Sequence, residues 1–397
     1  MREPPRGVLG APPAELVPGP RGDILLLSMR RVSNLVGYGF QYEFEDVISA
    51  LTGADRAHVT QLGLVELERR IYKALSLLSP SASLALRATP RLGGLRLEKA
   101  YDLFLPIFNH TYEVFAVNAI PGWRKRCRYA ACVISEAVET DLPEYLLESL
   151  AEFDHIYLCS NPVESVQRIA GRPCTYLPLA VDVPTFCPFP EPPSRSIDVL
   201  GIGRRSAITH SALMTLARSQ GLFYYYDTIQ MSELTNGARQ VSFSVIDPVE
   251  HRFKLASLLK RSSYYLASRA RADEFSEEYD ELSGRFVEGA AAGAIMVGEA
   301  PRTGKFLTLF DWPDSVVESR FDEPEIAAIL AQLDRDPERK TRIRRNNMVN
   351  ALRRHDWAYR LRTILEGAGM ELPPALLARE ARLRELADMV NGATLQP

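Results

Sequence analysis

The segment that most constrains the fold of this chain is GRFVEGAAAGAIMVGEAP, residues Gly284–Pro301. Residues Gly289–Gly293 carry almost no side-chain bulk, so we expect a short helix that packs closely on a sheet, followed by an apolar strand at Ala294–Val297. Glu288 stands at the head of that helix, where unpaired N–H groups and partial positive charge suit a polar or anionic ligand. The alternative is an alanine-rich helix that packs on a sheet and binds nothing.

Apolar runs that are typical of buried strands recur through the first half of the chain. They are Asp23–Met29, Tyr101–Phe108, Ala130–Ser135 and His155–Ser160, and helical stretches such as Leu62–Leu78 lie between them. Strands that alternate with helices predict a parallel sheet with right-handed crossovers. We therefore expect the first half to be a Rossmann-like domain.

The second half begins with a strand that ends in glycines and arginines, RSIDVLGIGRR at Arg195–Arg205. Gly201 and Gly203 are expected to let the backbone approach a diphosphate, and Arg204 or Arg205 to neutralise it. A lone G-x-G is weak on its own. The alternative is that these arginines pair with surface acids.

A proline-rich segment, CTYLPLAVDVPTFCPFP at Cys174–Pro190, separates the two halves. An apolar strand, then L-A-V-D, then several prolines are typical of a chain that leaves one domain through a stiff linker. The sequence therefore predicts a domain crossover here.

Asp280, seven further residues and then Glu288 in E-x-A-A-x-G resemble the E-x7-E motif of group 1 glycosyltransferases, which are retaining and use nucleotide sugars. The L-A-V-D…F-x-P segment is similar to that family's crossover. The resemblance implies an α/β protein of the GT-B fold, with two Rossmann-like domains facing each other across a cleft. It further implies that Glu288, beside Gly289, holds the donor's ribose and that Asp280 lies near the transferred sugar. Glu281 is the alternative first acid.

This resemblance also sets the expected domain boundaries. We expect a disordered leader at 1–22, an N-terminal Rossmann-like acceptor domain at 23–182 and a linker at 183–194. A C-terminal Rossmann-like donor domain is expected at 195–352. The helices of 353–397 are expected to bridge back to the N-terminal domain.

The phosphate cations depart from the pattern of the resembled family, in which a lysine follows G-R by five residues. Thr209 stands at that position here, so Arg205 and Lys260 are the candidate substitutes. Arg204 is our first candidate for stabilising the departing phosphate, because a positioned cation lowers the barrier where negative charge develops. Asp280 would accept hydrogen bonds from the sugar.

Polar residues at the ends of the first-domain strands are candidates for the acceptor side. Asn109 and His110 follow one strand and Glu136 follows the next, at the sheet edge where ligands bind in such folds. His110 and Glu136 suit acceptor contact or proton handling. Gly37 and Gly39 follow the first strand, in a loop that faces the acceptor in the resembled family. The alternatives are a structural histidine, a helix-capping glutamate and a turn that needs positive φ.

A basic run follows Trp123, with four cations in six residues at Arg124, Lys125, Arg126 and Arg128. It suits a phosphate-bearing acceptor or peripheral contact with an anionic membrane face. The alternative is a solvated surface.

Composition excludes several classes of protein. The 397 residues carry a net charge of −3, so we expect no nucleic-acid partner. The chain has no apolar run long enough to span a membrane and no secretory leader, and its five cysteines have no disulfide or zinc spacing. These features favour the cytoplasm, with a peripheral place at the inner membrane face as the alternative.

Together these features predict a metal-independent glycosyltransferase without a cofactor. It would move a sugar from a nucleoside diphosphate to an acceptor hydroxyl, in glycan, polysaccharide or glycolipid synthesis. The alternatives are a two-domain sugar-nucleotide epimerase and a non-catalytic GT-B protein that binds a glycan or a partner.

Overall fold

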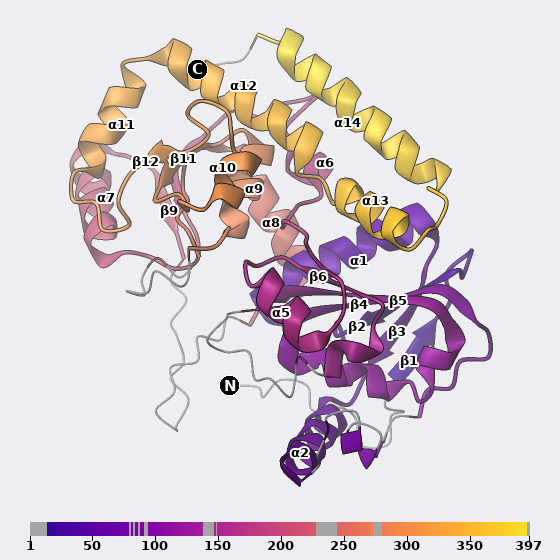
Figure 1. Cartoon of the computed structure of the whole chain (residues 1–397). Helices are drawn as coiled ribbons and strands as arrows, with labels where there is room; N and C mark the ends of the chain where they lie inside the picture. Colours follow the sequence, from indigo (N-terminus) through magenta and orange to yellow (C-terminus); the bar gives the residue numbers. More distant parts are fainter. Residues whose placement is uncertain are drawn as a thin grey trace. The chain divides into compact units, whose positions relative to one another are not determined.

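The computed structural model describes residues 14–78, 81, 84–85, 88–90, 94–137, 147, 149–227, 244–270, 272 and 280–394. They belong to two α/β units (Figure 1). Unit 1 takes Met1–Pro178, Ser244–Val249 and Arg360–Leu377, and unit 2 takes Leu179–Phe243, Glu250–Tyr359 and Ala378–Pro397.

The sheet of unit 1 has the order β1-β3-β2-β4-β5-β6-β7 in the described part of the chain. Its strands are β1 Ala14–Val17, β2 Ile24–Ser28, β3 Asp55–Val59, β4 Tyr101–His110, β5 Cys127–Glu136, β6 His155–Leu158 and β7 Cys174–Tyr176. All neighbours pair in parallel except β1, which is antiparallel to β3. Every residue of β2 is buried, which explains the uninterrupted apolar run of its sequence. The predicted parallel sheet is confirmed.

Strand β1 lies inside the segment expected to be a disordered leader. Ala14 pairs with Val59 and is only 2% exposed, and Leu16 packs against the core of unit 1. The backbone of residues 14–17 adds one strand to the sheet, and some of its side chains join the core. The expectation of disorder is therefore wrong for these residues.

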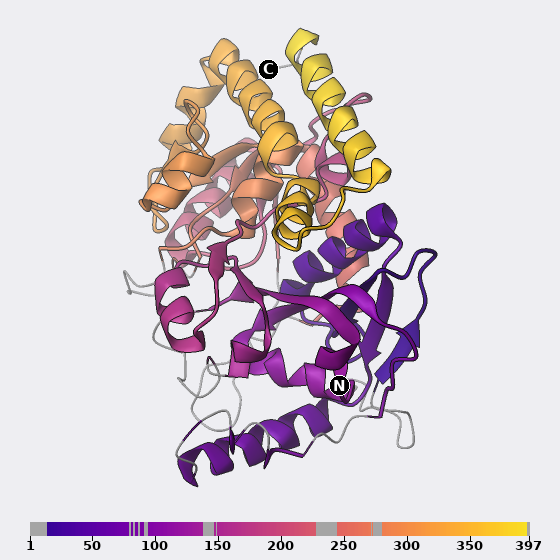
Figure 2. The same ribbon diagram turned by 45° about the vertical axis from the view of Figure 1, so that its right-hand side comes forward.

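The helices of unit 1 are α1 Gly39–Thr52, α2 Leu62–Leu78 and α5 Val163–Ala170, with 3-10 turns at Val36–Tyr38, Thr111–Ala119, Trp123–Arg126 and Leu150–Glu152. Helix α1 contacts β2 and β4, while α2 contacts the Thr111–Ala119 turn. Figure 2 shows α1 and α2 on opposite sides of the seven-stranded sheet. The rings of Phe104, Trp123 and Phe153 pack together in the core, with neighbouring centroids 4.8 and 5.3 Å apart.

The sheet of unit 2 is entirely parallel over the described residues, in the order β12-β11-β10-β8-β9. Its strands are β8 Ile197–Gly201, β9 Tyr224–Tyr226, β10 Ser262–Leu266, β11 Ile295–Gly298 and β12 Val317–Glu318. The carboxyl ends of all these strands therefore meet at one edge, which is where ligands bind in doubly wound sheets.

The remaining helices are α6 Val183–Phe186, α7 Ala207–Gln220, α8 Pro248–Lys260, α9 Gly284–Ala292, α10 Gly304–Leu309, α11 Ile326–Asp334, α12 Pro337–Arg354, α13 Trp357–Gly367 and α14 Pro374–Gly392. The division between the units falls within α8, α13 and α14. In unit 2, α7 packs with α11 and α9 packs with α12, and Figure 1 shows these pairs on opposite sides of the five-stranded sheet.

The crossover differs from the expected linker at 183–194. Leu179 onward belongs to unit 2, because Val181 pairs with the backbone of His355 and Trp357. The amide of Val183 also donates to Asp356 Oδ2 at 3.0 Å, and Arg379 binds both Asp182 and Asp356. These contacts fix the start of the expected linker on unit 2.

Candidate active site

A pocket lies at the carboxyl edge of the unit 2 sheet. The segments that line it follow β8, β10, β11 and β12, together with the start of α7 and one side chain each from α9 and α11. It holds about 510 Å³ of space, part of it open to solvent. The lining residues are Gly201, Ile202, Arg204, Arg205, Ser206, Thr209, His210, Leu266, Ser268, Arg285, Val297, Gly298, Ser319, Arg320, Phe321 and Ile326.

The G-x-G turn is shaped by what surrounds it. Gly203 has φ +84°, a conformation that side chains disfavour, and a Cβ there would lie 2.6 Å from Nη2 of Arg285. A Cβ on Gly201 would lie 3.1 Å from the hydroxyl of Tyr224. Ser206 caps α7 by accepting a hydrogen bond from the amide of Thr209. The structure therefore brings the predicted Gly201, Arg204 and Arg205 together in the lining of one pocket, with Gly203 in the same turn.

Arginines dominate the charge of this pocket. Arg205 donates to the carbonyl of Asp227 at 3.1 Å, and Arg285 donates to the carbonyl of Ile202 at 3.2 Å. In the part of the chain that the structure describes, neither guanidinium has a carboxylate in ion-pair contact. Arg320 lies on the exposed surface, 3.4 Å from Glu323. Burial, and then the charge of Arg205, lower the pKa of His210. The site is suited to an anion.

Arg285, Arg320 and His210 were missed at the sequence level. Arg285 lies three residues before Glu288, which is one turn along the same helix, so the helical period could have pointed to it. Arg320 follows the short strand β12 and has no comparable signal.

Thr209 stands where the resembled family has a lysine, and Lys260 was a candidate substitute for that lysine. The hydroxyl of Thr209 donates to the carbonyl of Phe321 at 2.7 Å and accepts from the amide of Glu323 at 2.8 Å, so it fixes one wall of the pocket. Lys260 ends α8 just before β10, at the amino edge of the sheet, and donates to the carbonyl of Thr185 at 3.0 Å. The structure therefore places Lys260 at the edge of the sheet opposite the G-x-G turn, away from Arg204 and Arg205.

Glu288 is not at the head of a helix. Helix α9 begins at Gly284, with Ser283 as its cap, so Glu288 lies in its middle and is 3% exposed. Its carboxylate forms an ion pair with Arg252 of α8, which is 4% exposed, and lies 3.5 Å from the hydroxyl of Tyr265. The predicted start of the helix was wrong, because the small residues Gly289–Ala292 continue a helix that already begins at Gly284.

Gly289 has a packing role. A Cβ at this position would lie 2.8 Å from the side chain of Met296 on β11 and 3.0 Å from the ring of Tyr265 on β10. The expected close packing of this helix on the sheet is therefore confirmed. Gly289 faces the sheet, so its expected place at the donor is wrong.

The two candidate first acids lie outside the pocket lining. Asp280 Oδ2 accepts a hydrogen bond from the amide of Arg302 at 2.9 Å, and the carbonyl of Glu281 accepts one from the amide of Ala270. Neither residue lines the pocket. The role of Asp280 near the sugar stays a prediction.

A second polar group lies at the carboxyl edge of the unit 1 sheet. His110 and Glu136 are the last residues of β4 and β5, are directly paired in register, and approach to 3.7 Å between Nδ1 and Oε2. Asn109 precedes His110, and its Oδ1 lies 2.9 Å from the side-chain amide of Gln41 on α1. The structure thus brings together the predicted acceptor-side residues Asn109, His110 and Glu136.

Glu113 contacts the backbone of this group and was not predicted from the sequence. Its carboxylate accepts the backbone amide of Asn109 at 2.7 Å, and burial raises the pKa of Glu113 to about 8. Gly37 and Gly39 lie in the preceding loop and at the start of α1. Neither has positive φ, so neither is a glycine required by the turn.

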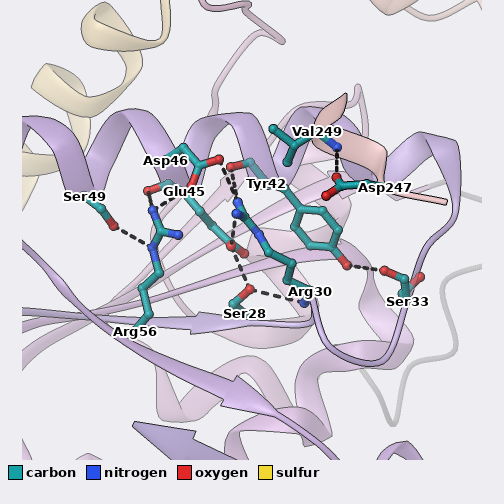
Figure 3. Close-up of polar contacts among 10 residues, drawn as sticks. All are labelled: Ser28, Arg30, Ser33, Tyr42, Glu45, Asp46, Ser49, Arg56, Asp247 and Val249. Carbon is teal, nitrogen blue, oxygen red and sulfur yellow. Dashed lines mark hydrogen bonds and ion pairs between the residues drawn. The ribbon is translucent and has the colours of Figure 1, made fainter. Parts of the chain in front are cut away.

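A buried polar network lies at the carboxyl end of β2 (Figure 3). Glu45 of α1 is completely buried, accepts the hydroxyl of Ser28 at 2.7 Å, and has one oxygen without a partner in the described structure. Arg30 and Arg56 both bind Asp46, at 2.9 and 2.7 Å. Burial raises the pKa of Glu45 to about 7, which makes it a group that titrates near neutrality.

The basic run at 124–128 is partly neutralised. Arg124 binds Asp154 through two contacts of 2.7 and 2.9 Å, and Arg128 lies 3.4 Å from Asp102 and donates to the carbonyl of Ala368. Lys125 and Arg126 are exposed. Two of the four cations, Arg124 and Arg128, thus bind partners within unit 1. Membrane contact through the basic run stays a prediction.

No helix in the described part of the chain combines the length and apolar character needed to cross a membrane. Within those same residues, no group of three or more His, Cys, Asp or Glu side chains is arranged to hold a metal ion.

Comparison with known proteins places this architecture. Residues 237–366, about a third of the chain, match the family described as "Glycosyl transferase-like". No curated protein sequence matches the chain.

Three solved structures are similar to it. An α-glucosyltransferase in complex with UDP has a TM-score of 0.53 and 10% identity, over 87% of this chain and 99% of that one. An α-glucosyltransferase in complex with UDP and a 13-mer DNA has a TM-score of 0.51 and 11% identity, over the same shares. An α,α-trehalose-phosphate synthase (UDP-forming) from Burkholderia vietnamiensis has a TM-score of 0.48 and 11% identity, over 88% and 98%.

The first two likenesses establish the fold. The family match covers both α8 and α9, the two helices that carry the Arg252–Glu288 ion pair. The predicted fold class is confirmed, and the match over residues 237–366 agrees with the predicted glycosyltransferase family. This chain therefore has the GT-B fold, and its residues 237–366 are similar to a glycosyl transferase-like family.

Proposed function

We propose that the donor is a nucleoside diphosphate sugar whose diphosphate binds in the unit 2 pocket. The observation that carries this proposal is the arginine-lined pocket at the G-x-G turn, in which Arg205 and Arg285 donate to carbonyls and pair with no carboxylate among the described residues. Guanidinium groups of this kind bind phosphate oxygens in a bidentate way. The similar α-glucosyltransferases were solved with UDP, which agrees with this choice of donor.

The reaction breaks the bond between the sugar's anomeric carbon and a phosphate oxygen. The electron pair of that bond stays on the oxygen, so the departing diphosphate gains one negative charge. The acceptor oxygen bonds to the anomeric carbon, and the proton of its hydroxyl is lost to the departing phosphate, to a base or to solvent. Arg204 and Arg205 stabilise the charge on the diphosphate where it develops.

The acceptor side belongs, in this proposal, to the polar edge of unit 1. His110 and Glu136 form a pair able to take or relay the acceptor's proton, and Asn109 offers an amide to a hydroxyl. Asp280 is kept as a hydrogen-bond acceptor for the transferred sugar. Retention of configuration, a cytoplasmic location and a role in polysaccharide or glycolipid synthesis stay predictions.

We assign Glu288 a supporting place in this site. Its ion pair with Arg252 anchors α9, and α9 carries Arg285 one turn earlier. A carboxylate that is 3% exposed and already paired has little surface left for a ribose.

Binding of UDP, GDP and ADP by titration calorimetry tests the donor site. Arg204→Ala with Arg205→Ala should weaken the tightest of them by at least about tenfold, since each charge-assisted contact contributes roughly 1.5–3 kcal/mol. Arg261→Ala is the matched control, because the side chain of that exposed arginine, which directly follows α8, donates to Ser257 and does not line the pocket. Equal dissociation constants in wild type and double variant would contradict the assignment of the pocket.

Activity separates a transferase from a binding protein. With a UDP-sugar that binds, slow release of UDP without added acceptor is expected, and it should continue in excess EDTA if no metal takes part. Loss of activity in EDTA that Mg²⁺ restores would show that the prediction of metal independence is wrong.

A further inference from the structure

Arg285 occupies an unusual place for an arginine in the first turn of a helix. Its Nε donates to the carbonyl of Ile202 at 3.2 Å, in the middle of the G-x-G turn. Its Nη2 lies only 2.6 Å from the position that a Cβ on Gly203 would occupy. The guanidinium therefore rests against the turn that approaches the phosphates.

The remaining donors of Arg285 are available for a ligand. The side chain lines the pocket, and among the described residues its hydrogen-bond partner is a neutral carbonyl and no carboxylate pairs with it. An arginine carries five N–H donors, of which the contact to Ile202 uses one. A half-buried cation with unused donors at a glycine turn is suited to a phosphate.

In the resembled family a lysine provides a further cation for the donor's phosphates, and another residue must take its place here. A nucleoside diphosphate presents two phosphates, and the position of the expected lysine is Thr209, whose hydroxyl is committed to Phe321 and Glu323. Lys260 lies at the opposite edge of the sheet. Arg320 is 72% exposed in its side chain and already pairs with Glu323. Arg285 is the better placed cation.

We propose that Arg285 is a catalytic residue that contacts the sugar-bearing phosphate of the donor, the one that departs with the electron pair of the broken bond. This inference rests on the proposed donor site and adds to it the residue that replaces the absent lysine. Arg204 and Arg205 bind the same diphosphate beside Arg285. Gly203 is glycine because any side chain there would displace the Arg285 guanidinium from the turn.

A purely structural arginine would also be sensitive to mutation, since its contact with Ile202 holds the turn. The two roles differ in which ligand they affect. Loosening the turn weakens every nucleotide alike, whereas a contact to the terminal phosphate affects diphosphates and spares monophosphates. The ratio of the UMP and UDP dissociation constants is therefore the decisive quantity.

The experiment measures Kd for UDP and UMP, and for pyrophosphate and phosphate as probes without a base, in the full chain. Arg285→Ala should weaken UDP and pyrophosphate by at least about tenfold and UMP by no more than about twofold. Arg285→Lys should recover part of the loss, because the charge remains without the guanidinium fork. Gly203→Ala should shift the ratio in the same direction, by displacing Arg285. Arg261→Ala should change nothing, and circular dichroism checks that each variant is folded.

Three results would overturn the inference. If Arg285→Ala weakens UDP and UMP by the same factor, Arg285 only supports the turn. If it changes neither, Arg285 does not contact the ligand. If wild type binds neither UDP nor pyrophosphate, the proposed donor site fails, and this assignment fails with it.

Discussion

Replacement of Glu288 by glutamine distinguishes a buried ion pair from a ribose ligand. Glu288 and Arg252 are 3% and 4% exposed and contact each other, so Glu288→Gln removes a counter-charge from a buried guanidinium. Breaking such a pair from one side costs about 3–5 kcal/mol. Glutamine keeps the shape and can still accept a hydrogen bond, so we expect a loss near the lower limit.

The melting temperature is the direct readout. About 3 kcal/mol in a unit of roughly 150–250 residues corresponds to a decrease of about 6–12 °C. Glu338→Gln is the matched control, because Glu338 is an exposed acid in the first turn of α12, where a helix-start charge contributes only about 0.3–1 kcal/mol. Replacing both Arg252 and Glu288 by apolar residues should restore much of the stability.

Affinity for UDP completes the test. Below the melting transition, Glu288→Gln should change Kd for UDP by less than about threefold. A variant that melts with wild type yet binds UDP at least about tenfold more weakly would refute the ion-pair account. It would instead restore Glu288 as the ribose ligand that the family resemblance implies.

Three further predictions concern the two polar edges and the buried network. Arg204→Ala should lower turnover of a bound UDP-sugar at least about tenfold, since a contact to a developing charge is worth roughly 2 kcal/mol or more; unchanged turnover would exclude Arg204 from the site. Burial raises the pKa of Glu45 from 4.5 to about 7, so its protonated form favours the folded state. Glu45 should lower stability by up to about 3 kcal/mol as pH rises from about 4.5 to about 7. In urea titrations, Glu45→Gln should remove this contribution and leave that of Glu113, whose pKa burial raises to about 8. His110→Ala should slow transfer to an acceptor while leaving Kd for UDP unchanged, and a parallel loss of UDP binding would contradict its place on the acceptor side.

Local sequence patterns determined the elements of this protein. The run Asp23–Met29 forms a strand because a continuous apolar stretch suits burial on both faces, and β2 is buried throughout. The residues Gly289–Gly293 predicted close packing because they lack side chains, and Met296 and Tyr265 do press against Gly289. The G-x-G-R-R turn was located because it directly follows an apolar strand, at the edge where ligands bind in such sheets.

Only the tertiary structure decided which side chains meet. Lys260 and Arg205 were both candidates in the sequence for the second phosphate cation. In the structure, Lys260 lies at the amino edge of the sheet, at the end of α8, and Arg205 lies at the carboxyl edge. The sequence predicts Glu288 as a ligand at the start of a helix, whereas in the structure it pairs with Arg252 of α8. Arg285 was not predicted, and only the structure shows that it lies against Gly203. The physical reason is that contact between distant segments depends on the order and direction of the strands, which local patterns do not encode.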